Sequence, residues 1–123
     1  MSDLDFSNIN ALAVLTGFLA DFAFTLLVGF LVVSLMTPAG SQQVPPTAEL
    51  VANGLGVVGA LIGGFVAGKI AGRQQVEHGL LASGLGLVIS LCFILPSGQF
   101  TLAFLGFAIL NLVAAGYGGH LSR

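Results

Sequence analysis

Hydrophobic residues dominate four long stretches of the chain, and short polar or proline-rich segments separate them. The stretches cover residues 9–36, 48–71, 78–95 and 100–121. Each is apolar on all faces over a length close to the ~20 residues that a helix needs to cross a bilayer. Strands of a membrane barrel would instead alternate apolar and polar residues in segments of ~10 residues. The pattern therefore predicts four transmembrane helices.

The separating segments fix how these helices are connected. The first, residues 37–47, contains three prolines, which break a helix because proline removes a backbone donor. The other two, residues 72–77 and 96–99, are short polar turns, and short connections make neighbouring helices antiparallel. We therefore expect residues 1–123 to form one all-α domain, a polytopic membrane protein built as an antiparallel four-helix bundle.

Composition supports a protein embedded in the lipid bilayer. Of its 123 residues, 56% are hydrophobic and 7% are charged, whereas a soluble domain has ~25% charged residues. With three Lys and Arg residues there is no basic face for nucleic acid. Cys92 is a single cysteine, and we interpret His78 and His120 as interfacial residues at helix ends. We expect no metal site and no cofactor.

The few cations predict the orientation of the chain. Lys69 and Arg73 lie at the turn between the second and third stretches, and Arg123 follows the fourth. With four spans all of them fall on one side, which the positive-inside rule assigns to the cytoplasm. The sequence thus predicts both termini in the cytoplasm, most simply at a bacterial inner membrane.

Small residues recur every four positions along the second stretch, which places them on one helix face. This ladder consists of Gly56, Ala60, Gly64, Gly68 and Gly72, with Gly59 and Gly63 in a second row beside it. A face without side chains lets another backbone approach closely, which is a main source of helix association in lipid. The contact is either internal to the bundle or made with another copy or a different membrane subunit.

One ionisable residue lies deep inside an apolar stretch. Asp21 is roughly ten residues from the cytoplasmic end of the first stretch, about 15 Å deep. An aspartate at the centre of a spanning helix costs roughly 2.5–3.5 kcal/mol. Asn111 and Ser90 are predicted at similar depths, and Thr25 is one turn from Asp21. These side chains form either a hydrogen-bonded cluster that fixes helix packing or a path for a proton, cation or cationic group.

Three short segments of the chain resemble motifs of a known group of proteins. Residues 63–69 (GGFVAGK), residues 78–81 (HGLL) and residues 17–21 (GFLAD) are similar to motifs of small, glycine-rich, four-span bacterial membrane proteins, a largely uncharacterised group. In that group the second span ends Gly-Gly-x-x-Ala-Gly-Lys/Arg and the third opens His-Gly-x-Leu. The resemblance implies the four-span architecture and no activity.

The sequence favours a non-catalytic function. No pair of nucleophile and base is recognisable, so we do not expect an enzyme. The first interpretation is a small integral membrane protein that packs against itself, as a homo-oligomer, or against a larger membrane complex as an accessory subunit. The alternative is a small channel or transporter that uses Asp21 for proton or cation coupling.

Overall fold

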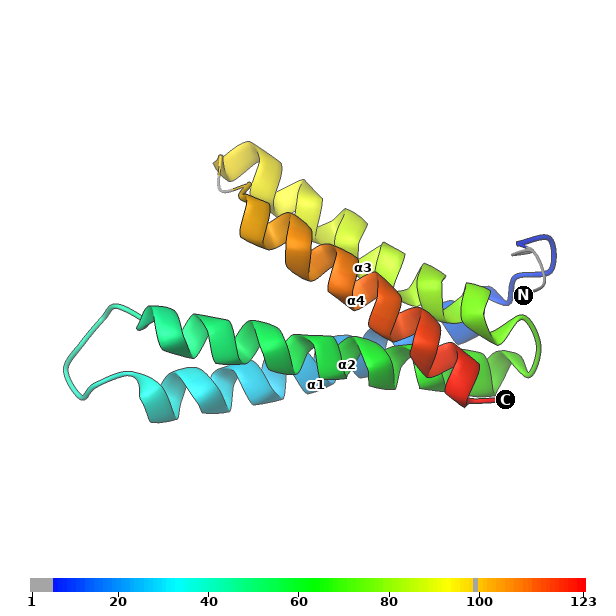
Figure 1. The fold of residues 1–123 in the computed structure, drawn as a ribbon, viewed down its shortest axis with the longest axis horizontal. Coiled ribbons are helices and arrows are strands. Elements are labelled where there is room, and N and C mark those ends of the chain that lie inside the picture. Colours follow the sequence, from blue (N-terminus) through cyan, green and yellow to red (C-terminus); the bar gives the residue numbers. More distant parts are fainter. Residues whose placement is uncertain (1–5, 99) are drawn as a thin grey trace.

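The computed structural model describes residues 6–98 and 100–123 and is all-helical over these residues. Its four helices are α1 (Ala11–Met36), α2 (Pro46–Ala71), α3 (Gln75–Ser97) and α4 (Leu102–Leu121). Consecutive helices run antiparallel, as predicted (Figure 1). The predicted fold class, four packed helices each long and apolar enough to cross a membrane, is therefore confirmed.

The helices form two hairpins arranged as a V. The α1–α2 hairpin and the α3–α4 hairpin meet at the end that carries Arg123 and diverge toward the opposite end (Figure 1). α2 contacts all three other helices, and α3 contacts α1 as well as α4. Among the described helices, α1 and α4 do not touch each other. The predicted bundle is thus closed at one end and open at the other.

Capping residues explain where the helices begin and end. The Asn10 side chain accepts hydrogen bonds from the backbone N–H groups of Leu12 and Ala13, so α1 begins at residue 11 instead of the predicted 9. α2 begins at Pro46, because proline fits the first helical position. Gly72 ends α2 in the left-handed region, with φ 70°, which glycine adopts without steric cost.

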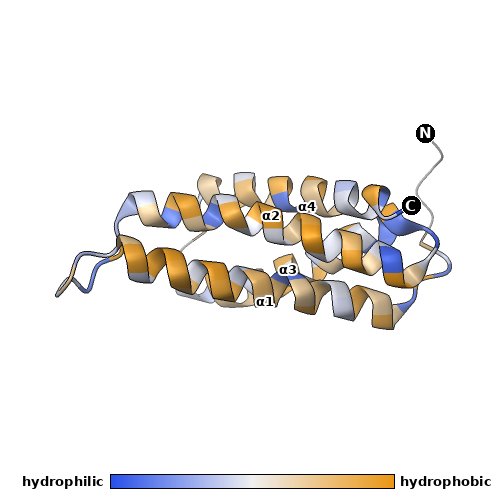
Figure 2. Cartoon of the chain, turned by 90° about the horizontal axis from the view of Figure 1, so that it is seen from below, coloured by the Kyte–Doolittle hydropathy of each residue, from blue (hydrophilic) through white to orange (hydrophobic). Residues whose placement is uncertain are grey.

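Small apolar residues are buried and large ones are exposed, which is the reverse of the pattern in a soluble protein. Every buried hydrophobic residue of the described chain is an alanine, while large side chains such as Leu35 (83% exposed) and Leu102 (84% exposed) point outward. Figure 2 shows hydrophobic residues over the outer faces of the helices. Such a surface fits lipid, where small residues mediate helix contacts and leucine gains nothing by burial. The fold is therefore consistent with an integral membrane protein.

The two small-residue rows of α2 face different partners. In the second row, a Cβ added at Gly63 would lie 2.6 Å from the Gly17 carbonyl oxygen of α1. In the first row, a Cβ added at Gly64 would collide with the Ala115 carbonyl of α4. The small residues of α2 therefore make close contacts inside the molecule, the second row with α1 and the first row with α4. These glycine contacts hold the V together at its closed end.

Not every residue of the predicted ladder packs in this way. Ala60 is buried, and a Cβ added at Gly68 would collide with the Ser122 hydroxyl of α4. A Cβ added at Gly56 would come no closer than 3.9 Å to Thr25, and one at Gly72 would meet nothing within 4 Å. Gly72 acts as a helix cap, and Gly56 lies where the two hairpins have already separated.

A buried histidine joins the ends of α1 and α3. His78 lies at a helix end, as predicted, in the first turn of α3, but its side chain is 0% exposed. Its Nε2 accepts a hydrogen bond from the backbone N–H of Asn10 at 2.9 Å. Its Nδ1 lies 2.9 Å from the Gln74 carbonyl oxygen and donates to it, since Nε2 is the acceptor. A neutral imidazole therefore links the beginning of α1 to the first turn of α3.

Candidate functional site: a polar cleft between the hairpins

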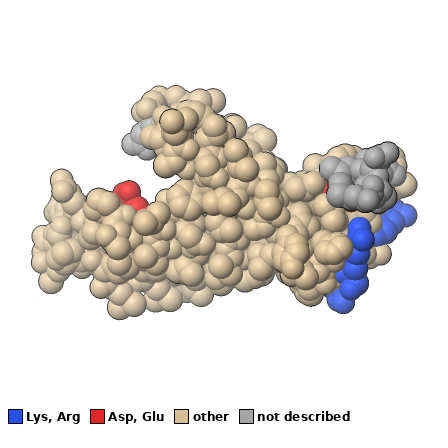
Figure 3. Space-filling view, viewed as in Figure 1, with Lys and Arg blue, Asp and Glu red and all other residues tan. Residues whose placement is uncertain are grey.

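The space between the diverging hairpins is a cleft of about 500 Å³, with walls from all four helices. Figure 3 shows the hollow from the side, with an acidic residue at its edge on the α1–α2 hairpin. The volume lies within the ~300–1,000 Å³ that is usual for small-molecule sites. Its polar side chains come from every helix: Asp21, Thr25, Glu49, Asn53, Ser83, Ser90, Thr101 and Asn111.

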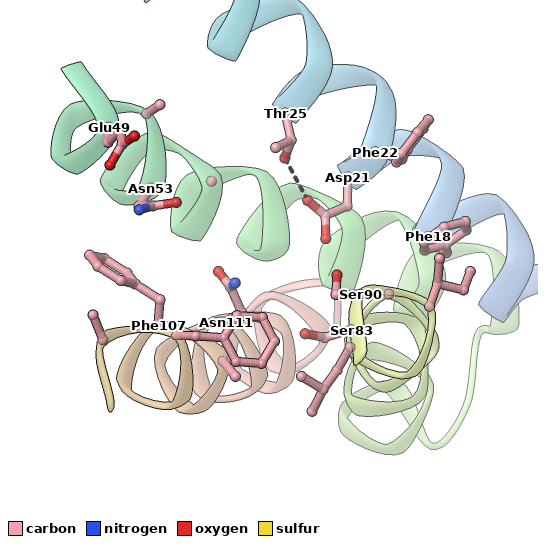
Figure 4. A pocket seen from close by; sticks show the side chains of 18 of the residues that line it. Phe18, Asp21, Phe22, Thr25, Glu49, Asn53, Ser83, Ser90, Phe107 and Asn111 are labelled. Carbon is pink, nitrogen blue, oxygen red and sulfur yellow. Dashed lines mark hydrogen bonds between the residues drawn. The ribbon is translucent and has the colours of Figure 1, made fainter. Parts of the chain in front are cut away.

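Asp21 lies on the α1 wall, held by its neighbours on α1 and α2. The Thr25 hydroxyl donates a hydrogen bond of 3.0 Å to Asp21 Oδ1, which is the carboxylate's one hydrogen bond among the described residues. A Cβ added at Gly59 would lie 2.8 Å from Asp21 Oδ1, and one added at Gly63 would lie 2.7 Å from Asp21 Cβ. The missing side chains of α2 thus create the room for this acid. In Figure 4 its second oxygen points away from Thr25 into the cleft.

The other predicted site residues also line the cleft, on the opposite hairpin. Ser90 projects from α3 and Asn111 from α4 (Figure 4). Neither is hydrogen-bonded to Asp21 among the described residues, so the predicted cluster shares one cavity but is not a connected network. Asn111 Oδ1 is buried and accepts no hydrogen bond in the described part of the chain. A buried amide oxygen without a donor is unfavourable by about 1–3 kcal/mol, which makes it a candidate ligand contact.

The sequence interpretation missed the polar residues on the α2 wall. Glu49 and Asn53 both line the cleft (Figure 4). They lie nearer the open end than Asp21 does. The signal that could have revealed them was their spacing of four residues, followed by Gly56 three residues later and Ala60 four after that, because positions three and four apart share one helix face.

The cleft has one open and one closed end. Beyond Asp21, the contacts of Gly17 with Gly63 and of Gly64 with Ala115 bring the helices together. The Lys and Arg side chains visible in Figure 3 lie at this closed end. No Lys, Arg or His lines the cleft, so its ionisable wall residues are the two acids Asp21 and Glu49. A cation inside the cleft would meet favourable charge along its whole length.

The fold and the cleft define a class of protein, a four-helix protein suited to a membrane with a polar cavity between its hairpins. Among the described residues, no three His, Cys, Asp or Glu side chains are grouped to hold a metal ion. Comparison with protein-family models, curated proteins and solved structures found no match.

Proposed function

We propose that the protein is a non-catalytic integral membrane protein that binds cations in the cleft and carries them toward Asp21, as a small channel or transporter. The observation that supports this most is the convergence of polar side chains from all four helices on one cavity that has acids but no cationic side chain. Packing alone would not require an open cavity, because a structural cluster satisfies its polar atoms internally.

The energetics of the cleft support a hydrated path. In hydrocarbon, the free carboxylate oxygen of Asp21 and the orphaned Asn111 Oδ1 would lack partners. Water entering from the open end supplies donors to Asp21, and a bound cation adds a charge partner for it. Glu49, on the same wall near the open end, attracts cations toward the entrance, since clefts lined by one sign of charge concentrate the opposite ion.

The orientation follows from the position of the cations. Lys69 lies in the last turn of α2, Arg73 in the turn that follows, and Arg123 just beyond α4, all at the closed end of the V. By the positive-inside rule, that end and both termini face the cytoplasm, most simply at a bacterial inner membrane. The cleft then opens to the outside, and Asp21 lies about 15 Å along α1 from the cytoplasmic end.

One feature supports a second candidate function, as an accessory subunit or homo-oligomer. Because the two hairpins diverge, the polar cleft between them is open on the flank that Figure 3 shows. Polar residues are unfavourable toward lipid, so a second copy or another membrane protein would cover that flank. This function also predicts a membrane partner, but it requires the covered cleft to be dry.

Thiol chemistry separates these two functions. Asn53→Cys, made in a Cys92→Ala background and reconstituted in lipid, is treated with small cationic and anionic methanethiosulfonates. A hydrated cation path predicts modification, with the cationic reagent several-fold faster, and Asp21→Asn should reduce that preference while leaving assembly intact. Phe30→Cys, whose native side chain is 70% exposed, is the lipid-facing control. If residue 53 reacts as slowly as residue 30, the cleft is dry and the cation function is wrong.

A further inference from the structure

Besides its polar residues, small residues and aliphatic ones such as Leu87 and Ile89, the cleft is lined by phenylalanines. Phe18 and Phe22 flank Asp21 on α1, and Phe104 and Phe107 line the cleft on α4. Phe18 and Phe22 are stacked, with ring centroids 5.8 Å apart. A ring edge of Phe18 would lie 3.4 Å from a Cβ added at Gly86, so this ring packs against α3. Asp21 thus shares the cleft with phenylalanines from both hairpins.

The two acids are too far apart to share one ion. Asp21 Oδ1 lies over Gly59, and Glu49 is ten residues earlier on α2, which corresponds to about 15 Å along the helix. Each carboxylate therefore meets a cation singly. A ligand at Asp21 would carry one positive charge that is neutralised by one carboxylate.

The ligands around Asp21 suit an organic cation better than a bare metal ion. Calcium takes six to eight oxygen ligands, and magnesium demands a near-ideal octahedron. Here no group of three His, Cys, Asp or Glu side chains exists among the described residues. An ammonium group needs only one carboxylate, and aromatic faces attract it by cation–π interaction.

The shape of the cleft agrees with this chemistry. Its volume of about 500 Å³ exceeds what a single small ion requires. The orphaned Asn111 Oδ1 offers an acceptor to a donor on the ligand, on the wall facing the α1–α2 hairpin. We infer that the cleft binds a monovalent organic cation, an ammonium group with an apolar or aromatic body, held by Asp21 between the phenylalanines of α1 and α4. This inference rests on the proposed cation function and specifies its ligand class.

The test is protection of an introduced thiol by probes of different charge and shape. Ser90→Cys in the Cys92→Ala background is alkylated with N-ethylmaleimide in lipid nanodiscs. The probes are benzyltrimethylammonium, tetramethylammonium, sodium, and benzenesulfonate as an anion of similar size. Asn53→Cys provides a second reporter on another helix in case the first variant does not fold.

The inference predicts that benzyltrimethylammonium slows alkylation at lower concentrations than the other cations and that benzenesulfonate has no effect. Asp21→Asn should raise the benzyltrimethylammonium concentration that gives half protection about tenfold or more, as expected for loss of a charge partner. Phe22→Leu should raise it about threefold or more, as expected for loss of a cation–π contact. Phe30→Leu, on the outer surface of the same helix, should leave the protection unchanged.

Three results would overturn the ligand class. Equal protection by sodium would mean that the apolar body is not recognised, although the cation function would stand. Protection unchanged by Asp21→Asn would indicate adventitious apolar binding. An accessible thiol that no cation protects would remove the ligand site altogether. A thiol that no water-soluble reagent reaches at residue 53 or 90 would instead contradict the proposed function itself.

Discussion

Replacing Gly64 by alanine should weaken the contact between α2 and α4 that closes the V. A Cβ at Gly64 would lie 2.6 Å from the Ala115 carbonyl carbon and 2.7 Å from its Cα, and it would collide with the carbonyl oxygen. Non-bonded carbon atoms pack at ~3.5–4.0 Å, so α4 must recede by about 1 Å. Backbone cannot move aside by a rotamer change, and the shift is transmitted to Gly79 of α3, which contacts the same carbonyl.

The expected loss can be worked from two opposing effects. Overpacking a tight contact destabilises a protein by about 1–3 kcal/mol. Alanine is favoured over glycine in a helix by about 1 kcal/mol, which offsets part of the loss. Because the obstacle is backbone, we take the upper part of the range and expect Gly64→Ala to lower the free energy of unfolding by about 2 kcal/mol. Gly64→Leu should prevent the hairpins from associating.

The same helix supplies a matched control. A Cβ at Gly54 would meet nothing within 4 Å, so Gly54→Ala gains helix propensity without a clash. Both variants are unfolded by sodium dodecyl sulfate titration from mixed micelles and followed by circular dichroism. Gly54→Ala should be as stable as the native chain or slightly more stable. If Gly64→Ala is as stable as Gly54→Ala, the close approach of α2 and α4 is wrong.

Two further predictions concern the closed end of the V. His78→Phe should lower stability in the same titration by about 0.5–1.5 kcal/mol, because the backbone N–H of Asn10 loses its acceptor. His120→Phe, at an exposed position, should have little effect, and equal losses would exclude the histidine link. Gly68→Ala should lower the free energy of unfolding by about 1–2 kcal/mol, because the added Cβ meets the Ser122 hydroxyl. Adding Ser122→Ala should recover part of that loss. A double variant no more stable than Gly68→Ala alone would mean that the clash lies elsewhere.

The helices could be predicted from the sequence because each apolar stretch is long enough to cross a membrane alone. The predicted ranges and the observed ones differ mainly at the beginnings, where local capping by Asn10 and Pro46 decides the first residue. The recurrence of small residues at every fourth position of the second stretch also predicted close helix contacts. It could not tell which row meets which helix, because that depends on the order in which the helices surround α2.

The cleft could not be predicted, because it results from the angle between two hairpins. Contacts at one end, such as Gly64 with Ala115, hold the helices together there, and nothing in the local sequence specifies that they diverge further on. Depth along the helices correctly brought Asp21, Ser90 and Asn111 to one region. Depth alone did not reveal that this region is a cavity, or that Asn53 of α2 lines it.

The burial of His78 illustrates a second limit. Its place beside a turn suggested an interfacial side chain, but the N-terminus of α1 covers it and supplies a hydrogen bond from Asn10. That contact joins residues 68 positions apart in the chain, so no local pattern indicates it. Tertiary contacts of this kind decide burial at helix ends, where composition is mixed.

The water content of the cleft is tested most directly by spin labels on α3. Ser90 lines the cleft, whereas Phe93, three residues away and thus within about 5 Å of the same depth, is 75% exposed on the outer surface. Cysteines at these two positions in the Cys92→Ala background carry nitroxides in nanodiscs, and power saturation compares their collisions with a water-soluble nickel chelate and with oxygen. We predict that the label at residue 90 collides preferentially with the nickel chelate and the label at residue 93 with oxygen. Preference for oxygen at both positions would mean that lipid or protein fills the cleft and would contradict a hydrated path to Asp21.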